Sequence, residues 1–379
     1  MTKSKSSTKE NVVILGGGLG GTIIAKELSA KLDHSKYNLI LVEARPYLIW
    51  ILGGTRMTVT NEKGAPDDYL FDYEKFFPAG KGTVKKAKAE KIVQNSDGRG
   101  GKLELAGGEI LPYRALVLAT GSKWTGPIDF PEDDADIRQF VSQWQQRFKS
   151  AEDVVIVGGG AVGIELAGEL RDEYPNKKIT IVQGSDKLLN STYPDRFRKF
   201  VQSQMRARGI DLILGEYVDQ FPPSGSGELV FRSGRKINAG VVAVTSGPVP
   251  NTGMIAESLG EDTLTERKHV KVLPTLQLKS HPSIFALGDI IDWNEQKQLF
   301  KIGGHASVIM ANILSLLSGS KPQKQYKTGP EVIVVTNGRG GGGMYLGMLW
   351  GIVFGNWAAR MLKSKDLGLS MIRPRMNAA

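Results

Sequence analysis

Two stretches far apart in the chain share one pattern of apolar and polar positions. Residues 12–28 read VVILGGGLGGTIIAKEL, and residues 154–170 read VVIVGGGAVGIELAGEL. In each, a short β-branched run is followed by three glycines and then by apolar positions at helical spacing. The run predicts a buried strand and the spacing after it predicts a helix. The sequence therefore predicts the same strand, turn and helix twice.

The glycines of both turns have the spacing GxGxxG, which suits a bound diphosphate. In the first copy, Gly16 permits a tight turn, Gly18 leaves room for the ligand and Gly21 lets the helix pack closely on the strand. Free N–H groups at the helix start then hold the diphosphate. The residues of these two turns predicted to bind nucleotide are Gly16, Gly18, Gly20, Gly21, Gly158, Gly160, Ala161, Val162 and Gly163. Two glycine turns that bind nothing are the alternative.

A second strand follows each turn, and the residue at its end differs between the two copies. YNLILVEAR ends in Glu43, Ala44 and Arg45, and Glu43 is placed to accept hydrogen bonds from the hydroxyls of an adenosine ribose. KKITIVQGSDK has Gln183 at the same place, where a carboxylate would reject a 2′-phosphate. Gln183, with Ser185 and Lys187, either tolerates NADPH as well as NADH or carries no preference.

Three further apolar runs end in small residues that suit contact with a ligand. PSIFALGDII ends in Gly288 and Asp289, where the glycine lets the backbone approach and the carboxylate accepts hydrogen bonds from ribityl hydroxyls. ALVLATGS ends in Thr120 and Gly121, which suit a crossing between two domains. VVAVTSGPVPNT carries Gly247 and marks the return crossing.

Two dinucleotide sites in one chain indicate a flavin facing a nicotinamide, because hydride transfer requires the two rings to stack. We therefore expect FAD and NAD(P)H as cofactors. The expected fold class is α/β, with two Rossmann-like dinucleotide-binding domains and a small C-terminal α+β domain. The expected boundaries are 11–121 and 253–320 for the FAD-binding domain, 122–252 for the NAD(P)H-binding domain and 321–379 for the C-terminal domain.

The order GxGxxG, Glu43, ATG, GxGxxGxE and GD resembles the flavoprotein family of glutathione reductase and type II NADH dehydrogenases. Within it, the second turn and the C-terminal RMLKSKDLGLS are most similar to the apoptosis-inducing factor-like family that includes ferroptosis suppressor protein 1. The resemblance runs from Asn11 to nearly the end of the chain. It implies FAD on the first unit and NAD(P)H on the second. It also implies transfer of two electrons from NAD(P)H to a quinone, such as a ubiquinone.

Composition limits the chemistry and the partners. The 379 residues include no cysteine, so disulfides, thiolate nucleophiles and Cys-ligated iron–sulfur clusters are excluded. Electrons must then pass through a bound organic cofactor, and no metal site is predicted. The net charge of +10 favours anionic partners, which include nucleotides, acidic lipid and nucleic acid. The opening MTKSKSSTKE has neither an apolar run nor a glycine after Met1, which favours a cytoplasmic location, with a peripheral position on a mitochondrial or other membrane left open.

Three residues are candidates for catalysis. Glu165, two positions after the second glycine turn, either orders the nicotinamide or complements the helix dipole. Lys301 and a glycine pair stand just ahead of a predicted helix, whose family equivalent points its N-terminus at the flavin. Lys301 either stabilises the reduced flavin or is a solvated charge. His305 either relays a proton to the reduced quinone or is a hydrogen-bonded core residue.

The C-terminal segment has an uncharged run, 344–359, with Gly347, Gly351 and Gly355 at helical spacing. It predicts a helix that follows a hairpin at 332–346. At sixteen residues the run is short for a membrane span of about 20. Three roles of this helix remain open: it lines a passage for a quinone, it lies on a membrane surface, or it packs in the core. The basic residues expected near lipid phosphates are Lys363, Lys365, Arg373 and Arg375.

Two other functions remain open on the sequence. One is an NAD(P)H-dependent reductase of an iron–sulfur protein, which would dock an acidic partner. The other is a nucleic-acid-binding flavoprotein of the apoptosis-inducing factor type. The lysines that would form its weak binding patch, or simply a solvated face, are Lys81, Lys85, Lys86, Lys88 and Lys91.

Overall fold

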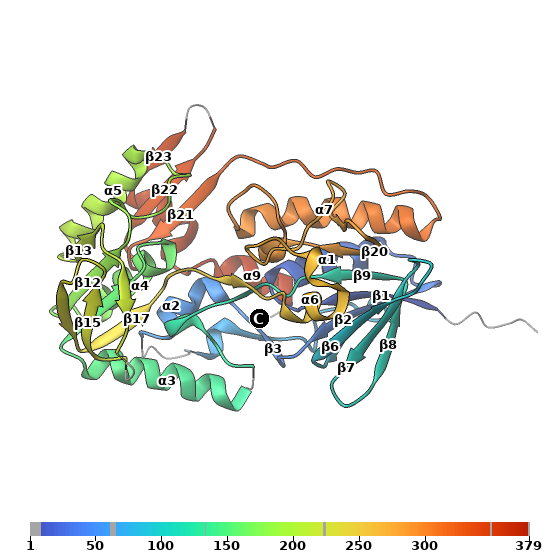
Figure 1. Cartoon of the computed structure of the whole chain (residues 1–379), viewed down its shortest axis with the longest axis horizontal. Coiled ribbons are helices and arrows are strands. Elements are labelled where there is room, and N and C mark those ends of the chain that lie inside the picture. The colour runs from blue at the N-terminus through green and yellow to red at the C-terminus, as the bar shows by residue number, and fades with distance from the viewer. Residues whose placement is uncertain (1–8, 61–65, 133, 223–224, 349–350, 378–379) are drawn as a thin grey trace, which may run out of the picture. The chain divides into compact units, whose positions relative to one another are not determined.

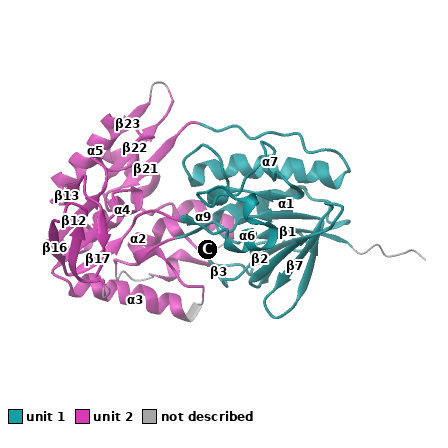
Figure 2. Ribbon diagram, viewed as in Figure 1, with its two compact units in different colours: residues 1–48, 72–123, 249–329 teal, residues 49–71, 124–248, 330–379 magenta. Residues whose placement is uncertain are grey.

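The computed structural model describes residues 9–60, 66–132, 134–222, 225–348 and 351–377. Two compact units each collect three segments of the chain (Figure 2). Unit 1 comprises Met1–Leu48, Asp72–Lys123 and Val249–Gly329, and unit 2 comprises Ile49–Phe71, Trp124–Pro248 and Pro330–Ala379. This division joins residues 330–379 to unit 2, whereas the sequence analysis set 321–379 apart, and the three-domain division stays a prediction.

Unit 1 is built around a six-stranded sheet in the order β19-β20-β9-β1-β2-β5. Figure 1 labels its strands β20, β9, β1 and β2. Neighbouring strands run parallel except β19, which pairs antiparallel with β20. All four residues of β9 are buried, as expected for a central parallel strand with both faces covered. The strands are β1 (Glu10–Leu15), β2 (Tyr37–Glu43), β5 (Thr83–Lys86), β9 (Ala115–Leu118), β19 (Gln277–Leu278) and β20 (His281–Ala286).

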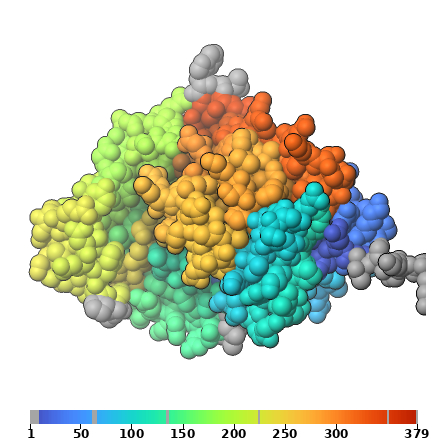
Figure 3. Space-filling model, turned by 45° about the vertical axis from the view of Figure 1, so that its right-hand side comes forward, coloured from blue at the N-terminus to red at the C-terminus, as the bar shows by residue number. Residues whose placement is uncertain are grey.

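Helices and a second sheet complete unit 1. The helices are α1 (Leu19–Lys31), α6 (Gly253–Leu259) and α7 (Leu299–Leu317), with short turns η4 (Glu261–Thr263) and η5 (Gly288–Ile290). The antiparallel sheet contains β6 (Ala89–Gln94), β7 (Gly101–Leu105) and β8 (Ile110–Tyr113). This part of the chain is coloured blue-green on the surface shown in Figure 3. Its strand β7 alternates between buried and half-buried positions, the pattern of a sheet with one face on the core. A two-stranded ribbon joins β10 (Ser122–Lys123) to β18 (Val249–Pro250).

By length and composition alone, α7 is apolar enough to cross a membrane. It packs against α1, however, and buries several polar side chains along one face, among them Asn312, which donates to the backbone carbonyls of Thr275 and Lys324. A helix with satisfied polar groups on its buried face is a core helix of unit 1. Lys85 of the predicted basic patch lies on β5 and is paired with Glu109 at 2.8 Å.

Unit 2 contains a second parallel sheet, in the order β13-β12-β11-β17. Its strands are β11 (Asp153–Val157), β12 (Lys178–Gln183), β13 (Asp211–Leu214) and β17 (Val241–Val244). Helices α3 (Asp134–Ser150), α4 (Ala161–Glu173) and α5 (Asp195–Ala207) belong to the same unit. On α5, Phe197, Val201 and Met205 recur every four residues and are all buried, which gives the helix one apolar face. The α/β fold with two Rossmann-like sheets is confirmed.

Smaller elements surround this sheet. An antiparallel sheet is formed by β14 (Val218–Gln220), β15 (Gly227–Phe231) and β16 (Lys236–Ala239). The short elements before it are η1 (Ile51–Gly53), α2 (Gly54–Met57), η2 (Asp67–Tyr69) and η3 (Gly126–Ile128). Strands β3 (Tyr47–Ile49) and β4 (Leu70–Asp72) lie where the chain passes between the units.

The C-terminal segment folds as a sheet where the sequence predicted a helix. The hairpin at 332–346 is confirmed by β21 (Val332–Thr336) and β22 (Gly342–Leu346), but β23 (Ile352–Phe354) pairs next to β22. The helix predicted at 344–359 is wrong, because Gly351 adopts φ +74° and β-branched residues follow it. Helical turns begin only at α8 (Asn356–Ala359), followed by η6 (Arg360–Ser364) and α9 (Leu369–Met376). Trp350, which belongs to the run predicted as a helix, lies outside the described residues.

A buried ion pair fixes this C-terminal segment within unit 2. Arg56 of α2 binds Glu169 of α4 through two hydrogen bonds of 2.8 and 2.9 Å. Arg56 also donates to the carbonyls of Ser364 and Lys365 at 2.8 and 3.1 Å. Both ionic side chains are less than 5% exposed. One guanidinium therefore joins three segments that are far apart in the sequence.

Replacing Arg56 should therefore strongly destabilise unit 2. We expect Arg56→Met to lower the free energy of unfolding by about 3–5 kcal/mol, because it leaves the Glu169 carboxylate buried without its cation. Arg138→Met is the matched control, since its 2.8 Å pair with Asp67 is exposed and worth about 0–1 kcal/mol. Urea unfolding followed by circular dichroism measures both. Equal losses in the two variants would contradict this account of the buried pair.

Candidate dinucleotide sites

The glycine turn of unit 1 connects β1 to α1 and leaves no room for a side chain at Gly16 or Gly21. Gly16 has φ +107°, and a Cβ there would stand 2.3 Å from the Ala119 carbonyl oxygen. A Cβ on Gly21 would stand 1.8 Å from the Gly16 carbonyl oxygen. At Gly18, in contrast, no described atom lies within 4 Å of the Cβ position. Two glycines are therefore required by packing, and the third faces open space in front of α1.

The turn of unit 2 repeats this geometry between β11 and α4. Gly158 has φ +122°, and its Cβ would stand 2.3 Å from the Thr245 carbonyl oxygen. A Cβ on Gly163 would stand 2.0 Å from the Gly158 carbonyl oxygen, while Gly160 has no described atom within 4 Å of its Cβ position. The two turns thus present the same empty space at the same end of a helix.

Backbone N–H groups face that space in both units. The helices begin at Leu19 and Ala161, and among the described residues no side chain caps either N-terminus. The first N–H groups of a helix have no partner inside it, and the helix dipole adds a partial positive charge. Such an end binds a phosphate. The residues present at both turns therefore fit a dinucleotide diphosphate.

Glu43 lies beside the first turn, and backbone N–H groups hold its carboxylate in place. One carboxylate oxygen accepts from the Gly17 N–H, and the other accepts from the Arg45 N–H at 3.0 Å. Each oxygen keeps a lone pair for a ribose hydroxyl. Tyr73, which no sequence motif marks, also contacts this turn, and its hydroxyl donates to the Gly17 carbonyl at 2.7 Å. Burial raises the pKa of Tyr73 well above its ordinary value, and the Glu43 charge raises it further, so Tyr73 remains a donor.

Gln183 takes the place of Glu43 beside the second turn. Its Oε1 accepts from the Gly159 N–H at 2.8 Å, and its Nε2 donates to the Ser185 hydroxyl at 2.9 Å. The Lys187 ammonium turns to the carboxylates of Asp186 and Asp195, at 2.6 and 3.3 Å. Gln183 therefore places a neutral, oriented amide at this position. A site that excludes 2′-phosphates would carry a negative charge there.

The other residues predicted to bind nucleotide lie at strand ends. In unit 1, Gly288 has φ +78°, and the adjacent Asp289 accepts a hydrogen bond from the Ser122 hydroxyl at 2.8 Å. The Thr120 hydroxyl donates to the Asn251 carbonyl at 2.7 Å. Gly121 in unit 1 and Gly247 in unit 2 have φ +65° and +105°, with no described atom within 4 Å of their Cβ positions.

Glu165 is engaged with the C-terminal segment of unit 2. It is 5% exposed, accepts from the Thr336 N–H at 3.1 Å and forms an ion pair with Lys363 at 2.5 Å. The placement of Lys363 near lipid phosphates is therefore wrong, because this cation neutralises a buried carboxylate instead. No local signal in the sequence links these two residues, which are 198 positions apart.

Lys301 and His305 lie inside α7 and are buried. The expectation that Lys301 and the glycine pair precede the helix is wrong, because α7 begins at Leu299. Lys301 Nζ lies 3.8 Å from a Glu295 oxygen, and His305 Nε2 lies 2.8 Å from the other. Sequence reasoning did not identify Glu295, which brings both candidate residues together.

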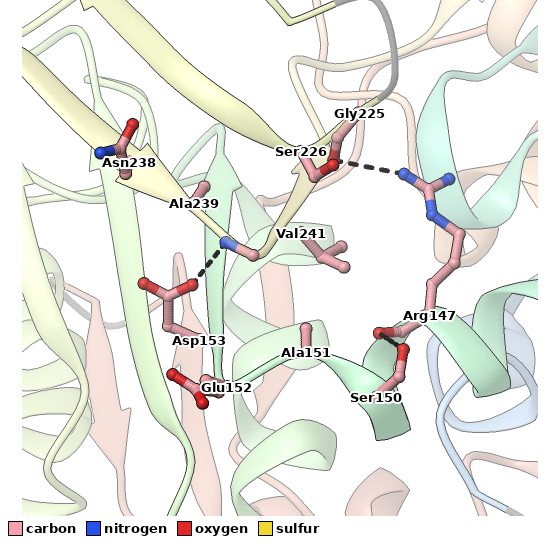
Figure 4. A pocket seen from close by; sticks show the side chains of 11 residues that line it. Arg147, Ser150, Ala151, Glu152, Asp153, Gly225, Ser226, Asn238, Ala239 and Val241 are labelled. Atoms are coloured by element: carbon pink, nitrogen blue, oxygen red, sulfur yellow. Dashed lines mark hydrogen bonds between the residues drawn. The ribbon is translucent and has the colours of Figure 1, made fainter.

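A separate recess of about 690 Å³ lies in unit 2, at the amino ends of β11 and β17. Figure 4 shows Arg147 on one side and Asp153 on the other. Arg147 donates to the Gly225 carbonyl at 3.3 Å, and Asp153 accepts from the Gly240 N–H. Nucleotides bind at the carboxyl ends of parallel strands. The recess is therefore distinct from the glycine turn of the same unit.

Comparison with known proteins identifies the family. The profile of the family described as "Pyridine nucleotide-disulphide oxidoreductase" matches residues 10–311. The chain belongs to this family. The expected resemblance and the FAD and NAD(P)H cofactors of an oxidoreductase are thereby confirmed at the level of the family. Because the sequence has no cysteine, the disulphide of the family's name has no counterpart here.

Named relatives agree with this assignment. The chain is 40% identical to the "FAD-dependent oxidoreductase FVFD30" of Flammulina velutipes, over 85% of this chain and 100% of that protein. It is 29% identical to "Ferroptosis suppressor protein 1" of Mus musculus, over 95% and 94% of the two chains. The solved sulfide:quinone oxidoreductase of Aquifex aeolicus shares the fold, with a TM-score of 0.78, 17% identity and coverage of 97% and 92%.

The open space at Gly18 and Gly160 can be tested with a matched pair of variants. Alanine at either position fits the folded chain, so we expect the free energy of unfolding to change by less than about 0.5 kcal/mol. Gly18→Ala should weaken FAD binding by roughly tenfold or more, because its Cβ meets the diphosphate. Gly160→Ala should retain FAD and weaken NAD(P)H binding instead. Titration calorimetry measures both, and unchanged affinities in either variant would show that the turn does not hold a diphosphate.

The neutral amide at Gln183 sets an expectation for nucleotide preference. We expect Gln183→Glu to raise KM for NADPH roughly tenfold relative to KM for NADH, because a carboxylate repels a 2′-phosphate. The reverse exchange in unit 1, Glu43→Gln, is the control and should alter FAD retention without changing this ratio. Steady-state kinetics with both nucleotides gives the ratio. If the Gln183→Glu ratio equals that of the unmodified chain, Gln183 does not face the ribose.

Proposed function

We propose that this chain is an NAD(P)H:quinone oxidoreductase that binds FAD in unit 1 and NAD(P)H in unit 2. The main support for this proposal is the pair of complete glycine turns. One lies beside the carboxylate of Glu43 and the other beside the amide of Gln183. A chain with two such sites binds two dinucleotides, and a chain without cysteine has no thiol of its own to oxidise. Hydride transfer from NAD(P)H to FAD is the role that we assign to the second site.

The protein groups contribute binding and orientation. In unit 1, the N–H groups at the start of α1 hold the diphosphate, Glu43 accepts from the ribose and Asp289 accepts from the ribityl chain. In unit 2, the start of α4 holds the diphosphate and Gln183 faces the ribose. Bound FAD supplies an acceptor for hydride that returns two electrons to a second substrate. No side-chain nucleophile is needed in this scheme.

Three observations support a quinone as the electron acceptor. The chain is similar over nearly its whole length to ferroptosis suppressor protein 1, and the resemblance of its motifs implies quinone reduction. The absence of cysteine removes a disulphide relay within the chain. Trp357 and Met361, four positions apart on the C-terminal helical turns, are 65% and 69% exposed. Exposed apolar side chains of this kind suit a position at a lipid surface, where long-chain quinones dissolve.

Anaerobic spectroscopy tests the proposal. Adding NADH to purified protein should bleach its flavin absorption, and adding a short-chain ubiquinone should restore the absorption faster than air-saturated buffer does. A reduced flavin that only oxygen reoxidises would remove the quinone. Faster recovery with an added ferredoxin than with the quinone would assign the chain to the iron–sulfur protein reductases.

A further inference from the structure

A buried polar cluster lies at the beginning of α7 in unit 1. Its centre is Glu295, whose side chain is 1% exposed. One Glu295 oxygen lies 2.8 Å from His305 Nε2, and the other accepts from the Tyr326 hydroxyl at 2.7 Å. The Lys301 ammonium lies 3.8 Å away. Burial raises the pKa of Glu295, but the hydrogen bonds from His305 and Tyr326 outweigh it and hold this pKa below its ordinary value.

These contacts determine where the proton of His305 resides. A carboxylate only accepts hydrogen bonds, so His305 Nε2 must carry a hydrogen and donate it to Glu295. The other ring nitrogen, Nδ1, faces the N–H of Gly288 at 3.3 Å. Because that backbone group is a donor, Nδ1 must present its lone pair. The neutral ring with hydrogen on Nε2 is the one form that satisfies both neighbours.

His305 thereby connects α7 to the turn predicted to bind the flavin. Gly288 adopts φ +78°, and a Cβ there would stand 3.3 Å from Ile302 Cδ1, so α7 packs directly behind the turn. Asp289 follows immediately and accepts from the Ser122 hydroxyl. The Tyr326 ring lies edge-on to the imidazole, with 4.4 Å between ring centroids, and restricts its rotation. The imidazole is therefore fixed in position and in hydrogen-bonding pattern.

We propose that Glu295 is a positioning residue that selects the Nε2-H tautomer of His305, so that His305 Nδ1 holds the Gly288–Asp289 turn in the conformation that binds FAD. This inference rests on the proposed FAD site of unit 1. It assigns His305 a fixed hydrogen-bonding role in place of proton transfer to a quinone.

A glutamine at position 295 separates this role from simple packing. Glu295→Gln keeps the size of the side chain, but its amide can donate as well as accept, so the tautomer of His305 is no longer selected. It also removes the negative charge that lies 3.8 Å from the Lys301 ammonium. The double variant Glu295→Gln/Lys301→Met removes that charge as well, and it separates loss of tautomer selection from loss of charge compensation. Tyr326→Phe is a second control, because it removes one hydrogen bond to Glu295 and leaves the His305 contact in place.

Nitrogen NMR of histidine-labelled protein reads the tautomer directly. Among the four histidines, the signals of His305 are those lost in a His305→Gln variant. We expect His305 at neutral pH to give the neutral Nε2-H pattern in the unmodified apoprotein. In Glu295→Gln we expect a mixture of tautomers. A protonated ring, or hydrogen on Nδ1, in the unmodified protein would overturn the proposal without any variant having to fold.

Binding of FAD to the apoprotein gives the second readout. We expect the dissociation constant to rise roughly tenfold in Glu295→Gln and in the double variant, as for loss of a hydrogen bond to a buried group, and less than about twofold in Tyr326→Phe. Recovery of affinity in the double variant would show that Glu295 only compensates Lys301, and unchanged affinity in Glu295→Gln would also overturn the proposal. The NMR and FAD-binding readouts do not depend on the electron acceptor, so they stay valid if the protein reduces no quinone. Complete absence of FAD binding in the unmodified protein would instead contradict the proposed function.

Discussion

A diphosphate can approach the N-terminus of a helix only where no Cβ occupies the space in front of it. On the proposed function, this constraint accounts for one glycine of each turn, Gly18 in unit 1 and Gly160 in unit 2. Packing alone requires glycine at Gly16 and Gly21, where a Cβ would overlap carbonyl oxygens. Packing does not require it at Gly18, which faces open space. Because Gly18 directly precedes the first residue of α1, the open space there fits a bound diphosphate.

The two units share the backbone geometry of the glycine turn but differ in the side chain beside it. In each, the residue at the end of the second strand accepts a hydrogen bond from the middle glycine of the turn, Gly17 or Gly159. Glu43 brings a negative charge to that position and Gln183 does not. Since the surrounding backbone is equivalent, the two sites differ mainly in the charge of this residue. A site with a neutral amide does not repel a nucleotide that carries an additional phosphate.

Local patterns in the sequence were sufficient for the parallel sheets and the glycine turns, because a buried strand and a tight turn each leave a signal within a few residues. They were insufficient where a residue's role depends on a distant partner. Glu165 was identified from its place after the second turn, but its partner Lys363 comes 198 positions later. Glu295 and Tyr326 meet across 31 positions and carry no motif. The C-terminal run was misread because evenly spaced glycines suit both a helix face and the turns of a sheet. The positive φ of Gly351 and the β-branched residues after it favour the sheet.

The central claim is that one chain holds two different dinucleotides, and counting them tests it most directly. FAD is quantified by absorption after its release from denatured protein, and NAD⁺ by equilibrium dialysis against the flavin-loaded protein. The account predicts one FAD and one NAD⁺ for each chain, bound at the same time. A colourless protein that takes up no FAD, or a protein in which NAD⁺ binds only by displacing FAD, would contradict it.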